Sequence, residues 1–245
     1  MPDSWPVIAL VTAYNEEKTV GPVLNAIQQS ASVDRIQLVD DGSDDRTAEI
    51  GREAGVHVIS LPERIPVGQA IMHHLQAIEG EALLVWCDAD LIHLQGAYVD
   101  TLIQQYRVNN VAQSLSSRGL PSSWPSALRN QRLLQRAWAE LFGPISGERV
   151  ILKSHFEEAI GLAGQLHWIE MMRGYGIVLF LNWYCQTFQK GQVITYFDQL
   201  QQRQKYEKWG KHAYWEMVAQ WVQFGKTWLK IQANSRRIRA LRKSP

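Results

Sequence analysis

Two aspartates separated by one residue follow a strongly apolar part of the chain. Asp88 and Asp90 come directly after Ala82–Cys87, which has the composition of a buried strand. Alternate residues at the end of a strand can direct two carboxylates toward one point. Oxygen ligands of this kind suit Mg²⁺ or Mn²⁺. The triplet is therefore a candidate metal site, and the alternative interpretation is a solvated turn.

Two further groups of polar residues, Tyr14–Glu17 and Asp40–Ser43, also follow apolar segments. The carboxylate of Asp40 or Asp41 can accept a hydrogen bond from a ring N–H of uracil or guanine, and its charge strengthens that bond. The alternative is that one of these aspartates caps a helix that begins near Asp44. We expect one aspartate to have each role.

The polar groups fall at the ends of elements that alternate along the first half of the chain. Apolar runs predict four strands, at Val7–Thr12, Ile36–Val39, Val56–Leu61 and Ala82–Cys87. Apolar residues at helical spacing lie between and after them, as in Val20, Val23, Leu24 and Ile27. This alternation predicts an α/β fold with a mostly parallel sheet covered by helices on both faces. Ligands bind at the carboxyl ends of the strands in such sheets, where the three polar groups would meet.

The second half of the chain has a less regular pattern. Ser116–Pro125 is rich in Ser, Pro and Gly and predicts a loop, Arg129–Leu141 predicts a helix, and Gly143–Gly147 predicts a turn. Helices are expected from there to the end. No linker composition is evident, so we expect one catalytic domain over 1–198 with a helical, basic extension of the same domain over 199–245.

Composition and charge exclude several classes of protein. The 245 residues are 46% hydrophobic and 20% charged, as in an ordinary globular domain. The net charge of +1 is unevenly distributed. Seven basic residues lie after position 225, and the chain before it has 18 basic and 24 acidic residues. An acidic body argues against nucleic acid as a partner. Two cysteines without metal-ligand spacing, and no apolar leader, predict a cytoplasmic protein.

Taken together, three motifs resemble the family 2 glycosyltransferases over roughly the first 95 residues. They are Ala13-Tyr14-Asn15-Glu16-Glu17, Val39-Asp40-Asp41-Gly42-Ser43-Asp44-Asp45-Arg46-Thr47 and Asp88-Ala89-Asp90-Leu91. The resemblance implies the GT-A fold, a nucleotide diphosphate sugar donor such as a UDP- or GDP-sugar, and Mg²⁺ or Mn²⁺. It also implies that Asp88 and Asp90 hold the metal and the diphosphate. The residues that it assigns to the nucleoside are Ala13, Tyr14, Asn15, Glu16 and Asp41.

A looser match involves Gly143–Arg149. This segment resembles one that borders the donor sugar and the acceptor in relatives such as polyprenyl-phosphate glycosyltransferases and glucosyl-phosphoglycerate synthases. The resemblance implies that Glu148 is a general base or holds sugar hydroxyls, and that Arg149 holds a phosphate. The alternative is a Gly-Pro turn before a helix, with the two charges in an ion pair.

A departure from the family pattern lies in the loop Pro66–Ala70. Many relatives carry a lysine beside the glycine that corresponds to Gly68, and this chain has Gln69 there. The resemblance assigns Gly68 to the donor site, and Arg64 is the cation that can replace the missing lysine.

These residues predict a metal-assisted glycosyltransferase that acts on an acceptor hydroxyl or phosphate. A nucleotidyltransferase is the first alternative, but the glycine-rich phosphate loop expected after its first strand is replaced here by Tyr14–Glu17. The second alternative is a non-catalytic nucleotide-sugar-binding protein.

Tryptophans at helical spacing and the basic residues from Lys226 to Lys243 also suit a helix on an anionic membrane surface. A lipid-linked or phosphorylated acceptor and a peripheral location at the inner face of the membrane would follow. The alternative is that the tryptophans pack against the catalytic domain and the basic residues are solvated.

Overall fold

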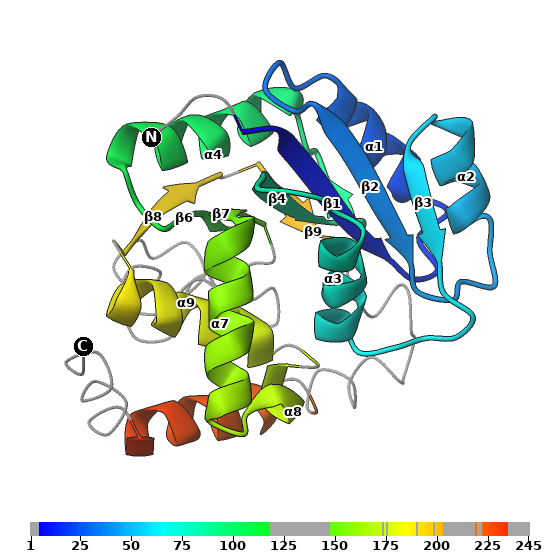
Figure 1. Cartoon of the computed structure of the whole chain (residues 1–245). Coiled ribbons are helices and arrows are strands. Elements are labelled where there is room, and N and C mark those ends of the chain that lie inside the picture. The colour runs from blue at the N-terminus through cyan, green and yellow to red at the C-terminus, as the bar shows by residue number, and fades with distance from the viewer. Residues whose placement is uncertain are drawn as a thin grey trace, which may run out of the picture.

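The computed structural model describes residues 5–117, 148–172, 174, 176–189, 191–197, 199–202, 219 and 222–234. Within them, the chain forms a seven-stranded sheet with helices on both faces (Figure 1). The strands lie in the order β3 (His57–Ser60), β2 (Arg35–Asp40), β1 (Val7–Ala13), β4 (Leu83–Asp88), β7 (Arg149–Leu152), β6 (Gln113–Ser117) and β8 (Gln192–Tyr196). All except β7 run in one direction, since β7 is antiparallel to both of its neighbours. The predicted α/β architecture with a mostly parallel sheet is confirmed.

The helices bury their apolar stripes against opposite faces of the sheet. One cluster of buried side chains joins the first face to α1 (Val20–Gln28) and α4 (Gly96–Asn109), with α2 (Thr47–Glu53) beside α1. The other cluster joins the second face to α3 (Val67–Gln76), α7 (Lys153–Gln165), α8 (Ile169–Met172) and α9 (Gly176–Phe188). Strand residues alternate between the two clusters, for example Ile8 and Leu10 against Val7 and Ala9. Two buried faces explain the unbroken apolar runs of β1 and β4.

The strands of the second half differ from the expected loop and helices. β6, with the sequence Gln-Ser-Leu-Ser-Ser, was not expected, and its last two residues fall in the expected loop from Ser116, yet all five of its residues are buried. Gln113 finds partners inside the protein, since it donates to the side chains of Asn182 and Gln192 at 3.2 and 2.8 Å. A strand with so many polar residues has no apolar pattern, so the local sequence did not indicate a strand.

The C-terminal helix over 222–234 packs against the domain. Phe224, Thr227 and Ile231 are buried, and Thr227 Oγ1 lies against Gly176 at the start of α9. This helix therefore packs on the domain through these three residues, and its contact with a membrane surface stays a prediction. The expected helix over 129–141, the turn over 143–147 and the basic residues from 236 onward lie outside the described residues. In the described part of the chain, no helix is long and apolar enough to cross a membrane.

Candidate active site

The carboxyl ends of β1, β2, β4 and β6 meet at one edge of the sheet, and the reversed strand β7 begins there. Register places Thr12 beside Asp88 and Ala13 beside Asp40. Glu148 immediately precedes β7, and its carbonyl accepts the N–H of Ser116 near the end of β6 at 3.1 Å. The topology therefore brings the three acidic groups found in the sequence, and Glu148, to the same edge.

The carboxylates of Asp88 and Asp90 point toward a common position. The side-chain nitrogen of Gln202 donates to Asp90 Oδ1 at 2.8 Å and lies 3.4 Å from Asp88 Oδ2. One atom within reach of both carboxylates shows that they face a common space, where a cation could meet oxygen from each. Both aspartates are partly exposed, so donor phosphates can approach them. This set of hard oxygen donors fits Mg²⁺ or Mn²⁺.

Asp41 lies beneath the loop that joins β3 to α3. Its Oδ1 accepts the backbone N–H of Ile65 at 2.7 Å, and its side chain is 7% exposed. Burial raises the pKa of Asp41 to about 6, although the Ile65 hydrogen bond and the nearby Arg64 guanidinium oppose this shift. The Arg64 guanidinium lies 4.8 Å from the centre of the Tyr14 ring. Arg64, Tyr14 and Asp41 thus lie together at one part of the edge. The assignment of Tyr14 and Asp41 to the nucleoside, and of Arg64 to the diphosphate, stays a prediction.

The loops after β1 and β2 are held together by four hydrogen bonds. The backbone N–H of Asn15 donates to Ser43 Oγ at 2.9 Å, that of Glu16 to Thr47 Oγ1 at 2.8 Å, and that of Glu17 to Asp45 Oδ2 at 3.1 Å. Asn15 Oδ1 accepts the Asp44 N–H at 2.9 Å. The motifs that contain the candidate nucleoside-binding residues therefore form one rigid unit.

Neither Asp40 nor Asp41 caps the helix that follows them, which corrects the expectation that one of them would. Asp40 Oδ1 accepts the Ser43 N–H at 3.3 Å within the turn. Asp45 instead accepts the N–H and the hydroxyl of Thr47, the first residue of α2. Asp45 thus closes a turn onto the first residue of α2, while the N-cap residue, Arg46, makes no side-chain capping bond.

Gly42 allows the β3–α3 loop to lie directly on the end of β2. Its φ is +69°, and a Cβ at this position would lie 2.6 Å from the carbonyl carbon of Glu63 and 2.9 Å from the nitrogen of Arg64. Gly55 has a similar φ of +72° but open space around the corresponding position. The two glycines share a conformational requirement, and only Gly42 also has a steric one.

We expect Gly42→Ala to lower the free energy of unfolding by more than Gly55→Ala. Left-handed backbone costs a non-glycine residue roughly 1–2 kcal/mol, so both variants should be less stable than the unmodified protein by this amount. Gly42→Ala must also displace the backbone that positions Ile65 and Arg64. Urea denaturation of both variants measures the difference. Equal losses would show that the loop does not rest on Gly42.

The side chain of Glu148 lies at the edge of the sheet beside Ser116, whereas that of Arg149 lies in the core. Ser116 Oγ donates to Glu148 Oε2 at 2.6 Å, and the Glu148 side chain is 1% exposed. Arg149 is fully buried, donates to Gln113 Oε1 at 3.2 Å and has its guanidinium 5.4 Å from the centre of the Trp86 ring. Burial lowers the pKa of Arg149 to about 10, so it stays protonated at neutral pH. The structure thus places Arg149 in the core beneath the edge, and its assignment to a substrate phosphate stays a prediction.

Two other predicted residues lie at the same edge. Ala13, the last residue of β1, is buried and its carbonyl accepts the Asp41 N–H at 2.8 Å. Gly68 is buried in the first turn of α3, whose N-terminus follows the carboxyl end of β3. A helix N-terminus there favours negative charge, which suits the assignment of Gly68 to the donor site.

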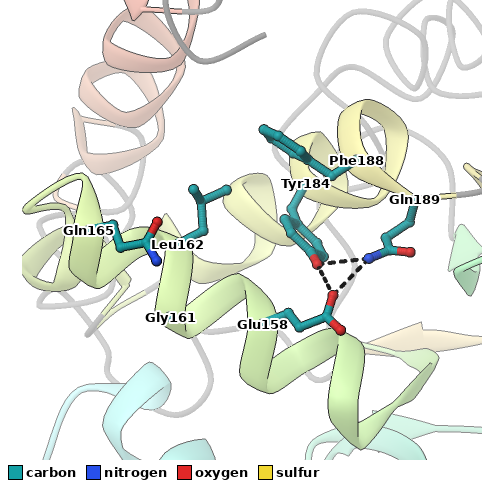
Figure 2. Close-up of a pocket in the computed structure, with 7 residues that line it drawn as sticks. All are labelled: Glu158, Gly161, Leu162, Gln165, Tyr184, Phe188 and Gln189. Atoms are coloured by element: carbon teal, nitrogen blue, oxygen red, sulfur yellow. Dashed lines mark hydrogen bonds between the residues drawn. The ribbon is translucent and has the colours of Figure 1, made fainter. Parts of the chain in front are cut away.

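A separate hollow of about 480 Å³ lies between α7 and α9. Within it, Glu158 accepts hydrogen bonds from Tyr184 Oη at 2.6 Å and Gln189 Nε2 at 2.9 Å (Figure 2). The Gln189 nitrogen also donates to Tyr184 Oη at 2.8 Å, which closes a triangle of polar groups. No residue that the sequence assigned to the site lines this hollow, and we do not place the chemistry there.

Three groups at the edge could not be found from the sequence. They are the amide of Gln202, the hydroxyl of Ser116 and the backbone N–H of Ile65. Gln202 lies more than a hundred positions after the aspartates and reaches them because β9 (Gln201–Gln202) pairs with β5 (Leu91–Ile92). A two-residue strand in a Gln-rich stretch carries no periodic signal.

Comparison with known proteins identifies relatives of the first half of the chain. Residues 8–157 match the family model for glycosyl transferase family 2. Glucosyl-3-phosphoglycerate synthase of Petrotoga mobilis is 28% identical over 103 residues, which are 37% of this chain and 31% of that protein. The 4,4'-diaponeurosporenoate glycosyltransferase of Staphylococcus aureus is 32% identical over 112 residues, which are 44% of this chain and 30% of that protein. The matches thus span about a third of the length of these curated relatives.

Solved structures extend the likeness of fold to most of the chain. Glucosyl-3-phosphoglycerate synthase from Mycobacterium tuberculosis, in complex with Mn²⁺, UDP-glucose and phosphoglyceric acid, superposes with a TM-score of 0.64 at 20% identity. The superposition covers 91% of this chain and 80% of that one. The described sheet and helices therefore form the GT-A fold expected from the motifs. Because the family model matches more than half of the chain, this protein belongs to glycosyl transferase family 2.

Proposed function

We propose that this protein transfers a sugar from a UDP-sugar to an acceptor hydroxyl or phosphate, with Mg²⁺ or Mn²⁺. The observation that carries the proposal is that Asp88 and Asp90 face a common space: the Gln202 nitrogen lies 3.4 and 2.8 Å from an oxygen of each. Asp88 and Asp90 suit a cation and the diphosphate, and the separate carboxylate of Asp41 suits the nucleobase. Together they make a site for a nucleoside diphosphate and its cation. When bound, the cation supplies charge neutralisation for the leaving diphosphate.

The named relatives support the choice of donor. Structures of the mycobacterial synthase contain UDP-glucose with Mn²⁺, and UDP with Mg²⁺. In the present chain, Asp41 would accept the N–H of the uracil ring, while Arg64 and the Tyr14 ring border it. Gly68 and the N-terminus of α3 would face the diphosphate. Glu148 would face the acceptor or the sugar hydroxyls.

The second candidate is a nucleotidyltransferase, which uses similar metal chemistry. It would break a phosphoanhydride bond of a nucleoside triphosphate and release diphosphate, whereas a glycosyltransferase breaks the bond from the sugar to the diphosphate and releases a nucleoside diphosphate. A non-catalytic binder would release neither product. Two incubations distinguish the three: UDP-glucose with Mn²⁺ and an acceptor, assayed for UDP, and UTP with glucose 1-phosphate and Mn²⁺, assayed for diphosphate. We expect UDP from the first, dependent on acceptor and metal, and diphosphate from the second without UDP from the first would contradict the proposal.

The same assay distinguishes two classes of acceptor. The relatives are named for a phosphoglycerate product and for a carotenoid carboxylic acid. We propose a phosphorylated or lipid-linked acceptor, because seven basic residues lie after position 225. The protein would be assayed with 3-phosphoglycerate in solution and with polyprenyl phosphate in anionic vesicles. Co-sedimentation with the vesicles at low and high salt tests the proposed peripheral membrane location separately.

We expect the affinity for UDP-glucose to fall roughly tenfold between pH 7 and pH 5, because the pKa of Asp41 is about 6. Only the ionised carboxylate forms the stronger, charge-assisted bond to the base. Lowering the pH through 6 protonates Asp41, so binding weakens in the acidic direction. Calorimetry with UDP-glucose is suitable, because its diphosphate has no group that titrates in this range.

Asp41→Asn provides the control for this pH dependence. The amide keeps the shape of Asp41 and can still accept the Ile65 N–H, but it does not titrate. We expect weak binding at both pH values and little change between them. If Asp41→Asn showed the same tenfold fall, another group would be responsible and the nucleobase assignment would be wrong.

A further inference from the structure

We propose that Gln202 is a third protein ligand of the cation held by Asp88 and Asp90, and that it binds through its side-chain oxygen. This inference rests on the proposed function, since it requires a metal at these aspartates. The family motif contains only the two carboxylates. In the described part of the chain, no group of three or more His, Cys, Asp and Glu side chains is placed to hold a metal. A further protein ligand among these residues must therefore be of another type.

Gln202 is held at the aspartates by its own strand. β9 pairs antiparallel with β5, and this pairing places Gln202 beside Leu91, the residue that follows Asp90. Leu91 is buried at 2% exposure. The Gln202 side chain then reaches back along β5 to Asp90 and Asp88.

The segment that leads into β9 is anchored to the same layer of the protein. The Phe197 ring stacks on Tyr98 of α4, with 4.7 Å between ring centres. Leu200 is 3% exposed and belongs to the apolar cluster under α1 and α4. The apolar contacts of Phe197 and Leu200, together with the pairing of β9 with β5, hold the backbone of Gln202 beside the aspartates. A ligand held in advance binds with a smaller loss of conformational entropy.

The chemistry of the amide allows it to serve both states of the site. Without a cation, the NH₂ group donates to the two carboxylates, as observed. A half-turn of the amide group exchanges nitrogen for oxygen at nearly the same position, and the two atoms have similar size. With a cation between the carboxylates, the oxygen faces it. Amide carbonyls are ordinary ligands of hard divalent cations.

Binding of Mn²⁺ in the presence of UDP tests this role without any measurement of transfer. Free Mn²⁺ is followed by electron paramagnetic resonance, and the variants are Gln202→Ala and Gln202→Glu. We expect Gln202→Ala to weaken Mn²⁺ binding by roughly tenfold, at the low end for residues around a metal. Gln202→Glu should bind at least as tightly as the unmodified protein, because both of its terminal atoms are oxygens. Gln201→Ala, on the neighbouring exposed residue, should bind Mn²⁺ normally and serves as the matched control.

Unchanged or tighter Mn²⁺ binding by Gln202→Ala would overturn the proposal. If the Gln202 amide only competes with the cation for the carboxylates, then Gln202→Ala will bind Mn²⁺ as well as or better than the unmodified protein. If Gln202→Glu is as weak as Gln202→Ala, the oxygen is not the important atom and the proposal is also wrong. Asp88→Asn with Asp90→Asn separates this inference from the proposed function. Mn²⁺ binding that is lost in this double variant but unchanged in Gln202→Ala leaves the function standing and removes Gln202 from the shell.

Discussion

Replacing Asp88 or Asp90 by Asn should lower the rate of sugar transfer by roughly 10³-fold. A metal ion contributes several kcal/mol to stabilising charge in a transition state, and a loss of about 4 kcal/mol corresponds to this factor. Each aspartate directs one charged oxygen to the space that both share with Gln202, so neither can replace the other. Initial rates at saturating UDP-sugar and a range of Mn²⁺ concentrations measure the effect.

The fold should survive these substitutions. Both aspartates are partly exposed at the end of β4 and do not fill the core. Asparagine keeps an oxygen that can accept the Gln202 hydrogen bond, so thermal unfolding should change little. Near-normal rates for both variants at limiting Mn²⁺ would refute the metal assignment.

Glu148→Gln should lower the rate of transfer by roughly 10²-fold, the lower end for the loss of a general base. The glutamine retains an oxygen for the hydrogen bond from Ser116, which holds Glu148 at 2.6 Å, so the local structure should persist. The affinity for UDP should not change, because Glu148 lies at the start of β7 while Asp41 follows β2, three strands away in the sheet. Turnover and UDP binding would be measured on the same preparation.

Ser116→Ala is the informative companion to this variant. It removes the hydrogen bond but keeps the carboxylate. We expect it to reduce the rate less than Glu148→Gln does, since the charge remains. If Glu148→Gln turned over normally, the buried carboxylate would have a structural role only, as in the alternative interpretation of this segment.

The donor half of the site was largely predictable from the sequence. Apolar runs located β1, β2, β3 and β4 to within a few residues. β1 and β4 are buried on both faces and so have continuous apolar patterns, whereas β3, at the edge of the sheet, is only partly buried and is indicated by Val58 and Ile59. The order of the motifs then placed their ends at one edge. What the pattern could not assign was the role of each polar residue within a motif. Asp45, and neither Asp40 nor Asp41, accepts the first N–H of α2, and that choice depends on distances of a few ångströms.

The rest of the site depended on contacts between distant parts of the chain. β6 is polar, and β7 begins with a buried arginine, so neither has a continuous apolar pattern that predicts its full length. Arg149 is charged but fully buried, since the Trp86 ring and Gln113 replace its hydration. Gln202 reaches the aspartates only through a strand of two residues. In each case tertiary partners outweigh the local preference of the residue, and a single sequence does not reveal those partners.

The hydrogen bond between the Ser116 N–H and the Glu148 carbonyl bears on how relatives of this protein can diverge. The bond, together with the pairing of Leu115 and Arg149, fixes both ends of the connection over 118–147 close together in the sheet. The entropic cost of joining two fixed ends rises only slowly with length, by about 0.6 kcal/mol for each doubling. Insertions, deletions or whole-segment exchanges between these ends would leave the strands that hold Asp41, Asp88 and Glu148 in place. The length and sequence of the connection between β6 and β7 can therefore change among relatives while the strands on either side of it keep their places.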